Sequence, residues 1–192
     1  MNNLGKAIEV IRKGGIVIFP TDTAFGVGCR IDDEKAVKRL FSIRKRPQSQ
    51  PTPVLFDSIE RVKEYLLPFG RDVERLMIKY WPGALTIILN CDKGKVPSLV
   101  RGGGDALGVR IPDHETIRKL IKGANIPILG PSANFHGEET PYNFRALDKE
   151  LIKLVDFVLA GETRDKGLAS TVVDCTKNPW EIIRQGGVSL DL

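Results

Sequence analysis

The chain has 192 residues, of which 42% are hydrophobic and 28% charged, and its formal net charge is +5. This length is enough for one domain with a sizeable core, and the composition excludes an intrinsically disordered chain. The modest positive charge favours anionic partners such as nucleotides or RNA, although it does not identify one.

The cysteines and the start of the chain bear on the compartment. Cys29, Cys91 and Cys175 are odd in number, widely spaced and without a C-x-x-C pair, so they predict neither a disulfide framework nor a thiolate metal site. The chain begins with a polar segment, and no apolar run approaches the roughly 20 residues that span a bilayer. We therefore expect a soluble, cytoplasmic protein.

The first third of the chain predicts a helix, a buried strand and a second helix. Apolar residues recur at helical spacing over 4–11, and Gly14-Gly15 supplies a left-handed stop before the apolar run 16–19. Asp32-Asp33 is a suitable cap for a helix over 36–41. A polar loop that contains Arg44-Lys45-Arg46 then leads to a short strand.

The remainder alternates helices with strands and ends in strands. Asp57 and Glu60 have the spacing of a capping box at the start of the next helix. We expect helices over 59–66, 73–80, 117–121 and 146–154, and strands over 54–56, 85–89, 107–111, 127–129, 170–174 and 181–184. This order predicts an α/β domain over residues 1–192, with a twisted mixed sheet of parallel and antiparallel strands flanked by helices.

Several common active sites are not indicated by the sequence. It contains no G-x-x-x-x-G-K-[ST] phosphate loop, and Gly26-Val27-Gly28 lacks the third glycine of a dinucleotide fingerprint. His114 and His136 do not have the spacing of metal ligands, and no G-x-S-x-G marks a nucleophilic serine. Hydrolase and zinc-enzyme interpretations are weak.

What remains is a set of polar loops, each at the end of a predicted strand, where ligands bind in α/β sheets. Taken singly, each loop has a structural explanation as a turn, a cap or a surface pair. Together, they resemble a polyanion site in which guanidinium groups hold phosphates and hydroxyl or amide groups orient the rest. The loops contain Thr21-Asp22-Thr23, Arg44-Lys45-Arg46, Arg110, Ser132-Ala133-Asn134, Ser170-Thr171 and Arg184.

Read in order, these segments resemble the YrdC-like family of threonylcarbamoyl-adenylate synthases, and the resemblance covers nearly the whole chain. The matching segments are GGIVIFPTDTAFGVGC, IRKRPQSQPTPVLF, WPGALTIIL, GVRIPDH, GPSANFHGEETP, STVVDCT and IIRQG. The family is described by a Lys-x-Arg pair followed by Ser-x-Asn, which Arg46, Ser132 and Asn134 match. Arg44 stands at the lysine position, Lys45 lies where a small residue is common, Gln50-Pro51-Thr52 replaces Lys or Asn, Pro, Leu, and Phe25 replaces a common tyrosine.

The resemblance implies one YrdC-like domain with an open basic cleft. It also implies a nucleotidyltransferase reaction in which L-threonine, bicarbonate and ATP give threonylcarbamoyl-AMP and pyrophosphate with Mg²⁺, at the start of threonylcarbamoyladenosine formation in tRNA. It assigns Arg44, Arg46 and Arg184 to the triphosphate, with Arg44 and Arg46 as the catalytic pair, and Ser132 and Asn134 to the nucleotide phosphates or ribose. It assigns Thr23, Arg110 and Ser170 to the threonine or its carboxylated amine. The adenylate would pass to a separate tRNA threonylcarbamoyl transferase.

Some assignments stay open at this stage. Lys45 is either a further phosphate contact or a solvated cation, and Asp22 either helps to place Mg²⁺ or organises a turn. The metal ligands are unknown. The rival functions are a non-catalytic protein of the same fold that binds double-stranded RNA or tRNA directly, and an enzyme that uses carbamoyl phosphate to form a carbamoyl adenylate.

Overall fold

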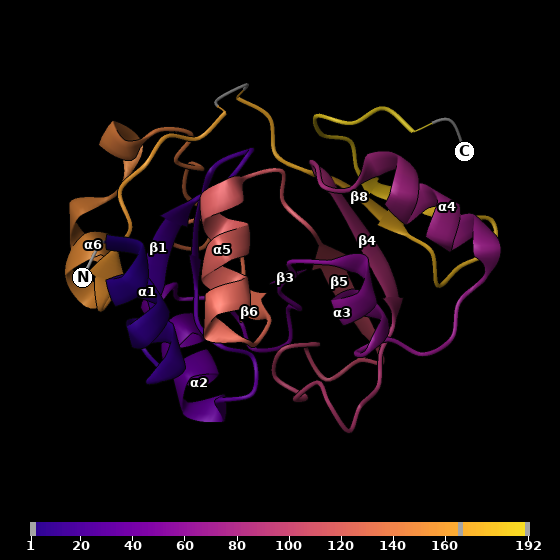
Figure 1. The fold of residues 1–192 in the computed structure, drawn as a ribbon, viewed down its shortest axis with the longest axis horizontal. Helices are drawn as coiled ribbons and strands as arrows, with labels where there is room; N and C mark the ends of the chain where they lie inside the picture. Colours follow the sequence, from indigo (N-terminus) through magenta and orange to yellow (C-terminus); the bar gives the residue numbers. More distant parts are fainter. Residues whose placement is uncertain (1–2, 165–166, 191–192) are drawn as a thin grey trace.

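The computed structural model describes residues 3–164 and 167–190, so the limits of the predicted domain at residues 1 and 192 lie outside the described residues. Helices and strands are interspersed through the first two thirds, as Figure 1 shows. The elements are α1 (Asn3–Arg12), β1 (Val17–Pro20), β2 (Phe25–Gly28), α2 (Glu34–Ile43), β3 (Val54–Leu55), α3 (Ile59–Lys63), α4 (Arg71–Tyr80), β4 (Leu85–Asn90), β5 (Ala106–Arg110), α5 (Glu115–Ala124), β6 (Ile128–Leu129), the 3-10 turn η1 (Phe144–Ala146), α6 (Lys149–Leu154), β7 (Phe157–Val158), β8 (Thr171–Asp174) and β9 (Glu181–Arg184).

The strands form two sheets, and both mix parallel with antiparallel pairs, which confirms the predicted mixed α/β fold. The smaller sheet has the order β2-β1-β7, and the larger has the order β6-β3-β5-β4-β8-β9. β1 pairs antiparallel with β2 and parallel with β7. In the larger sheet, β3–β5 and β4–β8 are parallel, whereas the other neighbours are antiparallel.

The two sheets meet where β2 runs beside β6. The Leu129 N–H donates to the carbonyl of Cys29, and the Val27 N–H donates to the carbonyl of Pro131, both at 2.9 Å. A Cβ on Gly28 would lie only 1.8 Å from the Leu129 carbonyl oxygen, so this approach requires glycine. Polar loops from both sheets are therefore brought to one seam.

The helix boundaries follow the predicted signals, with three differences, of which one is that α3 ends at Lys63 rather than at residue 66, because Leu66 forms a β-bridge with Cys91. Asp33 caps α2 by accepting hydrogen bonds from two N–H groups, and Gly14 follows α1 with φ of +80°. At α3 the cap is Ser58 rather than Asp57, because Ser58 accepts the hydrogen bond from the Arg61 N–H. The late helix begins at residue 149 rather than 146, since the preceding residues form η1 and Asp148 is the cap.

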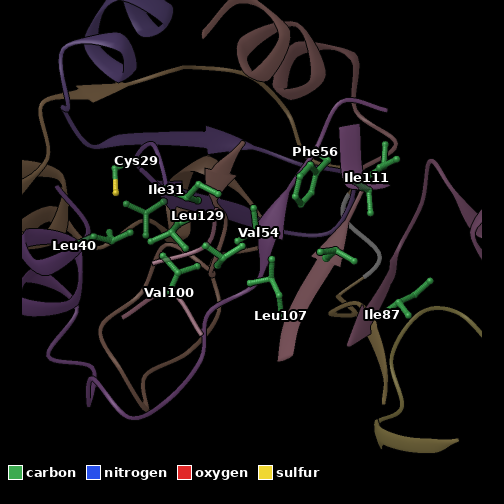
Figure 2. Close-up of a cluster of buried hydrophobic side chains, with 14 of the residues drawn as sticks. Cys29, Ile31, Leu40, Val54, Phe56, Ile87, Val100, Leu107, Ile111 and Leu129 are labelled. Atoms are coloured by element: carbon green, nitrogen blue, oxygen red, sulfur yellow. The ribbon is translucent and has the colours of Figure 1, made fainter. Parts of the chain in front are cut away.

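One hydrophobic cluster joins both sheets to the helices. It contains Phe25 and Val27 of the small sheet together with Ile87, Val109 and Val173 of the large one, all fully buried. Figure 2 shows side chains from α2, from the β2–β6 seam and from β3, β4 and β5 turned toward one another. A second cluster lies between α1, α5 and the small sheet. The loops at the seam are thus fixed on a packed scaffold.

Within the described residues, no helix is both long enough and apolar enough to cross a membrane. The longest described helices have ten residues, as in α4 and α5, and a helix of about 20 residues is needed to span a bilayer.

Candidate active site

A cavity of about 180 Å³ opens at the seam between the two sheets. All predicted site residues except Asn134 line it, so the structure brings together side chains that lie up to 161 positions apart, from Thr23 to Arg184. None of the lining residues in the described part of the chain is Asp or Glu. The lining consists of Thr21, Thr23, Ala24, Phe25, Gly26, Arg44, Arg46, Pro53, Leu55, Thr86, Arg110, Gly130, Pro131, Ser132, Thr140, Ala169, Ser170 and Arg184.

The turn between β1 and β2 forms one wall and is held by a buried ion pair. Arg110 donates to Asp22 Oδ1 at 2.6 Å, to Thr23 Oγ1 at 3.1 Å and to the Gly83 carbonyl at 3.0 Å. The two charged side chains are only 8% and 5% exposed. Asp22 therefore neutralises Arg110 and fixes the turn, which matches the turn-organising alternative of the sequence analysis.

The opposite wall is formed by residues 44–53, which we call the arginine loop. Arg44 lies at the end of α2 and is 3% exposed. Its Nε donates to the Asn134 carbonyl at 3.0 Å and its Nη2 donates to Asn134 Oδ1 at 3.1 Å, whereas its Nη1 has no hydrogen-bond partner among the described residues. Burial, together with the nearby charge of Arg46, lowers the pKa of Arg44 to about 10.

Asn134 lies behind Arg44 and is 9% exposed. Its Oδ1 also accepts a hydrogen bond from Ser132 Oγ at 2.6 Å, and its Nδ2 donates to the Glu138 carbonyl at 2.6 Å. We call residues 131–138 the serine-asparagine loop. The side-chain amide of Asn134 thus forms its hydrogen bonds to Ser132 and Glu138 inside this loop. Its predicted contact with a nucleotide stays a prediction.

Arg46 and Lys45 point to different surroundings. Arg46 is partly exposed, lines the cavity and donates from Nη2 to the Pro51 carbonyl at 2.9 Å, while burial lowers its pKa. Lys45 does not line the cavity; its exposed side chain lies over the ring of Phe135, with Nζ 4.9 Å from the centroid. Lys45, the central cation of the Arg44-Lys45-Arg46 run, therefore contacts an aromatic ring and not the cavity.

The last strand supplies the third cation. Arg184 of β9 donates from Nε to the Ser170 carbonyl and from Nη2 to Ser170 Oγ, both at 3.0 Å. Ser170 Oγ lies 3.0 Å from Thr86 Oγ1. Burial lowers the pKa of Arg184, and the positive charge of Arg110 lowers it further. Two cations thus face the same space without a carboxylate between them in the lining.

A second hollow of about 420 Å³ continues from this cavity along the face of the larger sheet. It shares Pro53, Thr86, Ser170 and Arg184 with the first cavity. Its remaining lining is Pro51, Thr52, Ile88, Arg101, Gly102, Gly104, Asp105, Ala106, Gly108 and Val172. A polar, cationic pocket therefore adjoins a mainly apolar one.

Comparison with known proteins identifies the family to which this fold belongs. A family model for Sua5, YciO and YrdC proteins, described as telomere recombination, matches residues 9–186. The chain belongs to the Sua5/YciO/YrdC family.

Relatives in this family are named threonylcarbamoyl-AMP synthase. The chain is 35% identical over 96% of its length to the one from Pyrococcus abyssi and 30% identical over 97% to the one from Bacillus subtilis. It spans 54% of the length of each of these two. The Vibrio cholerae relative is 29% identical, and the chain covers 98% of it.

Solved structures of the Sua5/YciO/YrdC family have the same fold. The crystal structure of P. abyssi Sua5 complexed with L-threonine matches with a TM-score of 0.91 and 36% identity, covering 96% of this chain and 54% of that one. E. coli YciO matches with a TM-score of 0.87 and 26% identity, covering 98% of this chain and 91% of that one. The predicted YrdC-like resemblance is confirmed.

Two hydroxyl residues of this Sua5/YciO/YrdC cavity, Thr86 and Thr140, were not singled out from the sequence, and Thr21 was named there only as part of a polar loop. Thr21 Oγ1 accepts from the backbone N–H groups of Thr23 and Ala24 and so organises the first wall. Thr86 Oγ1 lies 3.0 Å from Ser170 Oγ, and Thr140 lines the cavity two residues after the serine-asparagine loop. Thr86 lies between apolar residues of the predicted strand 85–89. Because alternate residues of a strand point to opposite faces, this polar position could have indicated a site on one face of the sheet.

The cysteines take no part in this cavity. Cys29 is fully buried, which raises the pKa of its thiol, and burial raises the pKa of Cys175 to about 12. Thiols with raised pKa values are poor nucleophiles. Within the described residues, no group of three or more His, Cys, Asp or Glu side chains is arranged to hold a metal ion.

Proposed function

We propose that this chain carries out threonylcarbamoyl-AMP synthesis, joining L-threonine, bicarbonate and ATP to give threonylcarbamoyl-AMP and pyrophosphate. The observation that carries the proposal is the convergence of Arg44, Arg46, Arg110 and Arg184 on a cavity whose described lining has no carboxylate. A cationic pocket of this kind suits substrates that are all anions at neutral pH or carry a carboxylate. Membership of a family with relatives named for this reaction supports it.

Three arginines hold the triphosphate in this proposal. Burial lowers the pKa of Arg44, partial desolvation lowers the pKa values of the half-exposed Arg46 and the more exposed Arg184, and no carboxylate pairs with these side chains in the described structure. A buried cation without a counter-ion is stabilised when an anionic ligand binds beside it. Ser132 supplies a hydroxyl to the nucleotide phosphates or ribose, and Asn134 orients it from behind.

Thr23, Arg110 and Ser170 hold the threonine or its carboxylated amine. Arg110 bonds Thr23 directly, and Ser170, which immediately precedes β8, lines the same cavity. Because Asp22 already neutralises Arg110, this side presents hydrogen-bonding groups with less net charge than the arginine loop. Such a side suits a zwitterionic amino acid. The Sua5 structure complexed with L-threonine supports an amino-acid site in this fold.

The adjoining apolar hollow suits the nucleoside. Its sides are formed by Pro51, Ile88, Ala106 and Val172, and it shares Arg184 with the cationic cavity. A flat base in this hollow leaves the phosphates beside the arginines. Burial of the ring against these side chains contributes binding free energy without a specific polar partner.

The residues suit the bond changes that the reaction needs. The threonine amine adds to bicarbonate with loss of water to give an N-carboxy adduct. A carboxylate oxygen of this adduct attacks the α-phosphorus, the bond between that phosphorus and the β-phosphate oxygen breaks, and pyrophosphate leaves. Catalysis of such a transfer consists mainly of positioning and charge neutralisation. Arginines and hydroxyls on a rigid scaffold supply both.

In this proposal, Mg²⁺ binds together with the nucleotide and not at a site formed by protein carboxylates. No Asp or Glu lines the cavity among the described residues, and Asp22 is held by Arg110. In nucleotide sites, Mg²⁺ keeps several waters and binds substrate phosphates. The protein residues do not form a carboxylate site for the ion, so its ligands would be phosphate oxygens and water.

The product is a mixed anhydride of a carbamic acid and AMP, which water hydrolyses readily. A partner must therefore accept the threonylcarbamoyl group soon after release. We assign this role to a separate tRNA threonylcarbamoyl transferase in the cytoplasm. Direct binding of tRNA or double-stranded RNA by this chain stays a prediction.

Pyrophosphate release tests the proposal. The purified chain is incubated with Mg-ATP and bicarbonate, with and without L-threonine, and the product mass is measured. We expect threonine-dependent release and the mass of threonylcarbamoyl-AMP. Arg46→Ala should lower the rate, whereas Arg75→Ala should not, because Arg75 lies on the exposed face of α4 with 79% of its side chain exposed.

Other outcomes would contradict the proposal in distinguishable ways. Release without threonine would indicate an ATP-hydrolysing enzyme. Release with carbamoyl phosphate but without threonine would indicate carbamoyl adenylation. Tight, salt-sensitive RNA binding in a folded protein that does not turn over ATP would indicate the RNA-binding function instead.

A further inference from the structure

The left-handed residue Lys45 stands between the two arginines of the arginine loop. Its φ is +52°, a conformation that costs a non-glycine L-residue roughly 1 kcal/mol or more. Lys45 and Asn125 are the non-glycine residues with positive φ in the described part of the chain. Asparagine tolerates this conformation, but lysine has no local hydrogen bond that favours it.

The local hydrogen bonds explain why the left-handed turn is needed. The Lys45 N–H donates to the Ser42 carbonyl, and the Arg46 N–H donates to the Phe41 carbonyl, both at 3.0 Å. This is the Schellman ending of a helix, which usually has glycine at the left-handed position. The turn reverses the chain after Arg44 and directs Arg46 toward the cavity.

The side chain of Lys45 adds a contact that glycine would lack. Its Nζ lies 4.9 Å from the centre of the Phe135 ring, and Phe135 is 9% exposed. A lysine ammonium over an aromatic face is stabilised by the ring quadrupole. The ring belongs to the serine-asparagine loop, so the contact joins the two loops that carry the phosphate-binding residues.

Backbone and guanidinium contacts join the same two segments. The His136 N–H donates to the Arg44 carbonyl at 2.8 Å, and Arg44 donates twice to Asn134. Residues 44–45 are thus bound to residues 134–136 at three successive positions. Contacts this closely spaced make the two loops one unit.

We propose that Lys45 is a positioning residue: through Phe135 it holds the arginine loop against the serine-asparagine loop and keeps Arg44 and Arg46 aimed at the anionic ligand without contacting that ligand. The inference rests on the proposed function for the identity of the ligand. It assigns a role to the central cation of the Arg44-Lys45-Arg46 run, which does not line the cavity.

Hydrogen exchange of the ligand-free protein tests the coupling. The variants are Lys45→Met, which keeps the length of the side chain but removes its charge, and Phe135→Leu. We expect each to speed amide exchange in both segments, 44–50 and 132–138. Faster exchange in 44–50 alone, or no change in either segment, would overturn the proposal. Lys45→Arg should restore slow exchange, because arginine also stacks on aromatic rings.

Calorimetric titration with a non-hydrolysable ATP analogue tests the consequence. We expect Lys45→Met and Phe135→Leu each to weaken binding about two- to five-fold, the range of an exposed cation–π contact. The double variant should be no weaker than either single variant, since both remove one contact. If Lys45 touched the phosphates directly, Phe135→Leu would have no effect and the losses would add.

Two further variants separate the side chain from the backbone and from general stability. Lys45→Gly removes the strain together with the side chain; it should not lower Tm, yet it should loosen both segments and weaken binding. Unchanged binding in Lys45→Gly would overturn the proposal. Lys79→Met is the matched control, because Lys79 lies over Tyr80 at 5.0 Å on α4, outside the cavity lining; it should change neither readout.

The exchange measurement also separates this proposal from the proposed function. If the wild-type chain does not bind the analogue, the ATP assignment fails, while exchange in the two segments still decides whether Lys45 couples them. If the analogue binds but exchange and affinity are unchanged in Lys45→Met, the positioning role fails and the function stands.

Discussion

The two walls of the cavity each contain a buried arginine, but only one of these arginines is paired with a carboxylate. Arg110, beside the β1–β2 turn, forms an ion pair with Asp22 and bonds Thr23 and Gly83. Arg44, in the arginine loop, donates only to the neutral acceptors of Asn134 and leaves Nη1 without a partner. Both side chains are less than a tenth exposed.

The difference separates an arginine whose charge the protein itself neutralises from one that lacks a counter-charge among the described residues. Arg110 is neutralised within the protein, so its removal or the removal of its partner disturbs the fold. Arg44 is not neutralised, and the lowering of its pKa to about 10 records the free energy that burial of its charge costs. An anionic ligand would supply the missing counter-charge. Folding stability and ligand affinity should therefore respond differently on the two walls.

The largest effect is expected from breaking the buried pair. Asp22→Asn removes the negative charge and leaves Arg110 buried with an uncompensated charge, which should lower the free energy of unfolding by about 3–5 kcal/mol in a urea titration. Asp72→Asn is the matched control, because the Arg75–Asp72 pair is 79% and 77% exposed and should contribute at most about 0.5 kcal/mol. Equal losses in both variants would remove the contrast between the walls.

Arg44→Met should weaken ligand binding strongly but change the free energy of unfolding only slightly. Loss of hydrogen bonds from a charged donor to phosphate should weaken binding of an ATP analogue by roughly 10- to 100-fold, following the usual 1.5–3 kcal/mol. The free energy of unfolding should change by less than about 1 kcal/mol, because relief of the buried charge offsets the lost bonds to Asn134. Calorimetry and urea titration measure the two quantities. A stability loss as large as that of Asp22→Asn would show that Arg44 is structural too.

The orphan hydroxyl of Thr52 gives a smaller effect of opposite sign. Thr52 is 2% exposed and its Oγ1 has no hydrogen-bond partner. Thr52→Val keeps the shape and removes the unpaired polar atom, so it should raise the free energy of unfolding by about 1 kcal/mol. Thermal denaturation would check the sign. A lower Tm would mean that the hydroxyl is satisfied in solution, for example by water.

The smallest effect is a pH dependence of ligand affinity. Arg44 is charged below its pKa and neutral above it, and an anion binds the charged form, so affinity should fall as pH rises through about 10. Half of the charge is lost at that pH, which predicts about a two-fold loss between pH 8 and pH 10. Arg44→Met should lack this part of the dependence. Parallel profiles for the two proteins would place the titrating group elsewhere.

The order of elements could be predicted well from the sequence because local signals were strong. The helical spacing of Val73, Leu76 and Met77 and the apolar run of β4 define their elements, and Asp33 caps α2 as expected. The strands β2 and β7 were not predicted. Glycines at two of the four positions of β2 weaken its strand signal, and a pair such as Phe157-Val158 is too short to show a period. Ser58 replaces Asp57 as a cap because neighbouring residues compete for one position.

The site could be predicted as a set of residues but not as an arrangement. The resemblance to a family identified the four arginines that line the cavity and the hydroxyls of Thr23, Ser132 and Ser170, but not those of Thr86 and Thr140. It could not show that Arg110 pairs with Asp22, 88 positions away, or that Arg44 reaches Asn134, 90 positions away. Such pairs depend on the sheet order and on the β2–β6 seam, which no local pattern encodes. For the same reason, the sequence predicted one mixed sheet, whereas the structure has two.

The span of the cavity along the chain has a consequence for synthesis. Its first wall comes from Thr21–Thr23 and its last cation from Arg184, and β1 pairs with β7, which lies about 140 residues later. A nascent chain on the ribosome therefore has no complete site until β9 has emerged and paired with β8. Truncated products of interrupted translation would lack Arg184, to which we assign phosphate binding, so they would bind the nucleotide more weakly if that proposal holds.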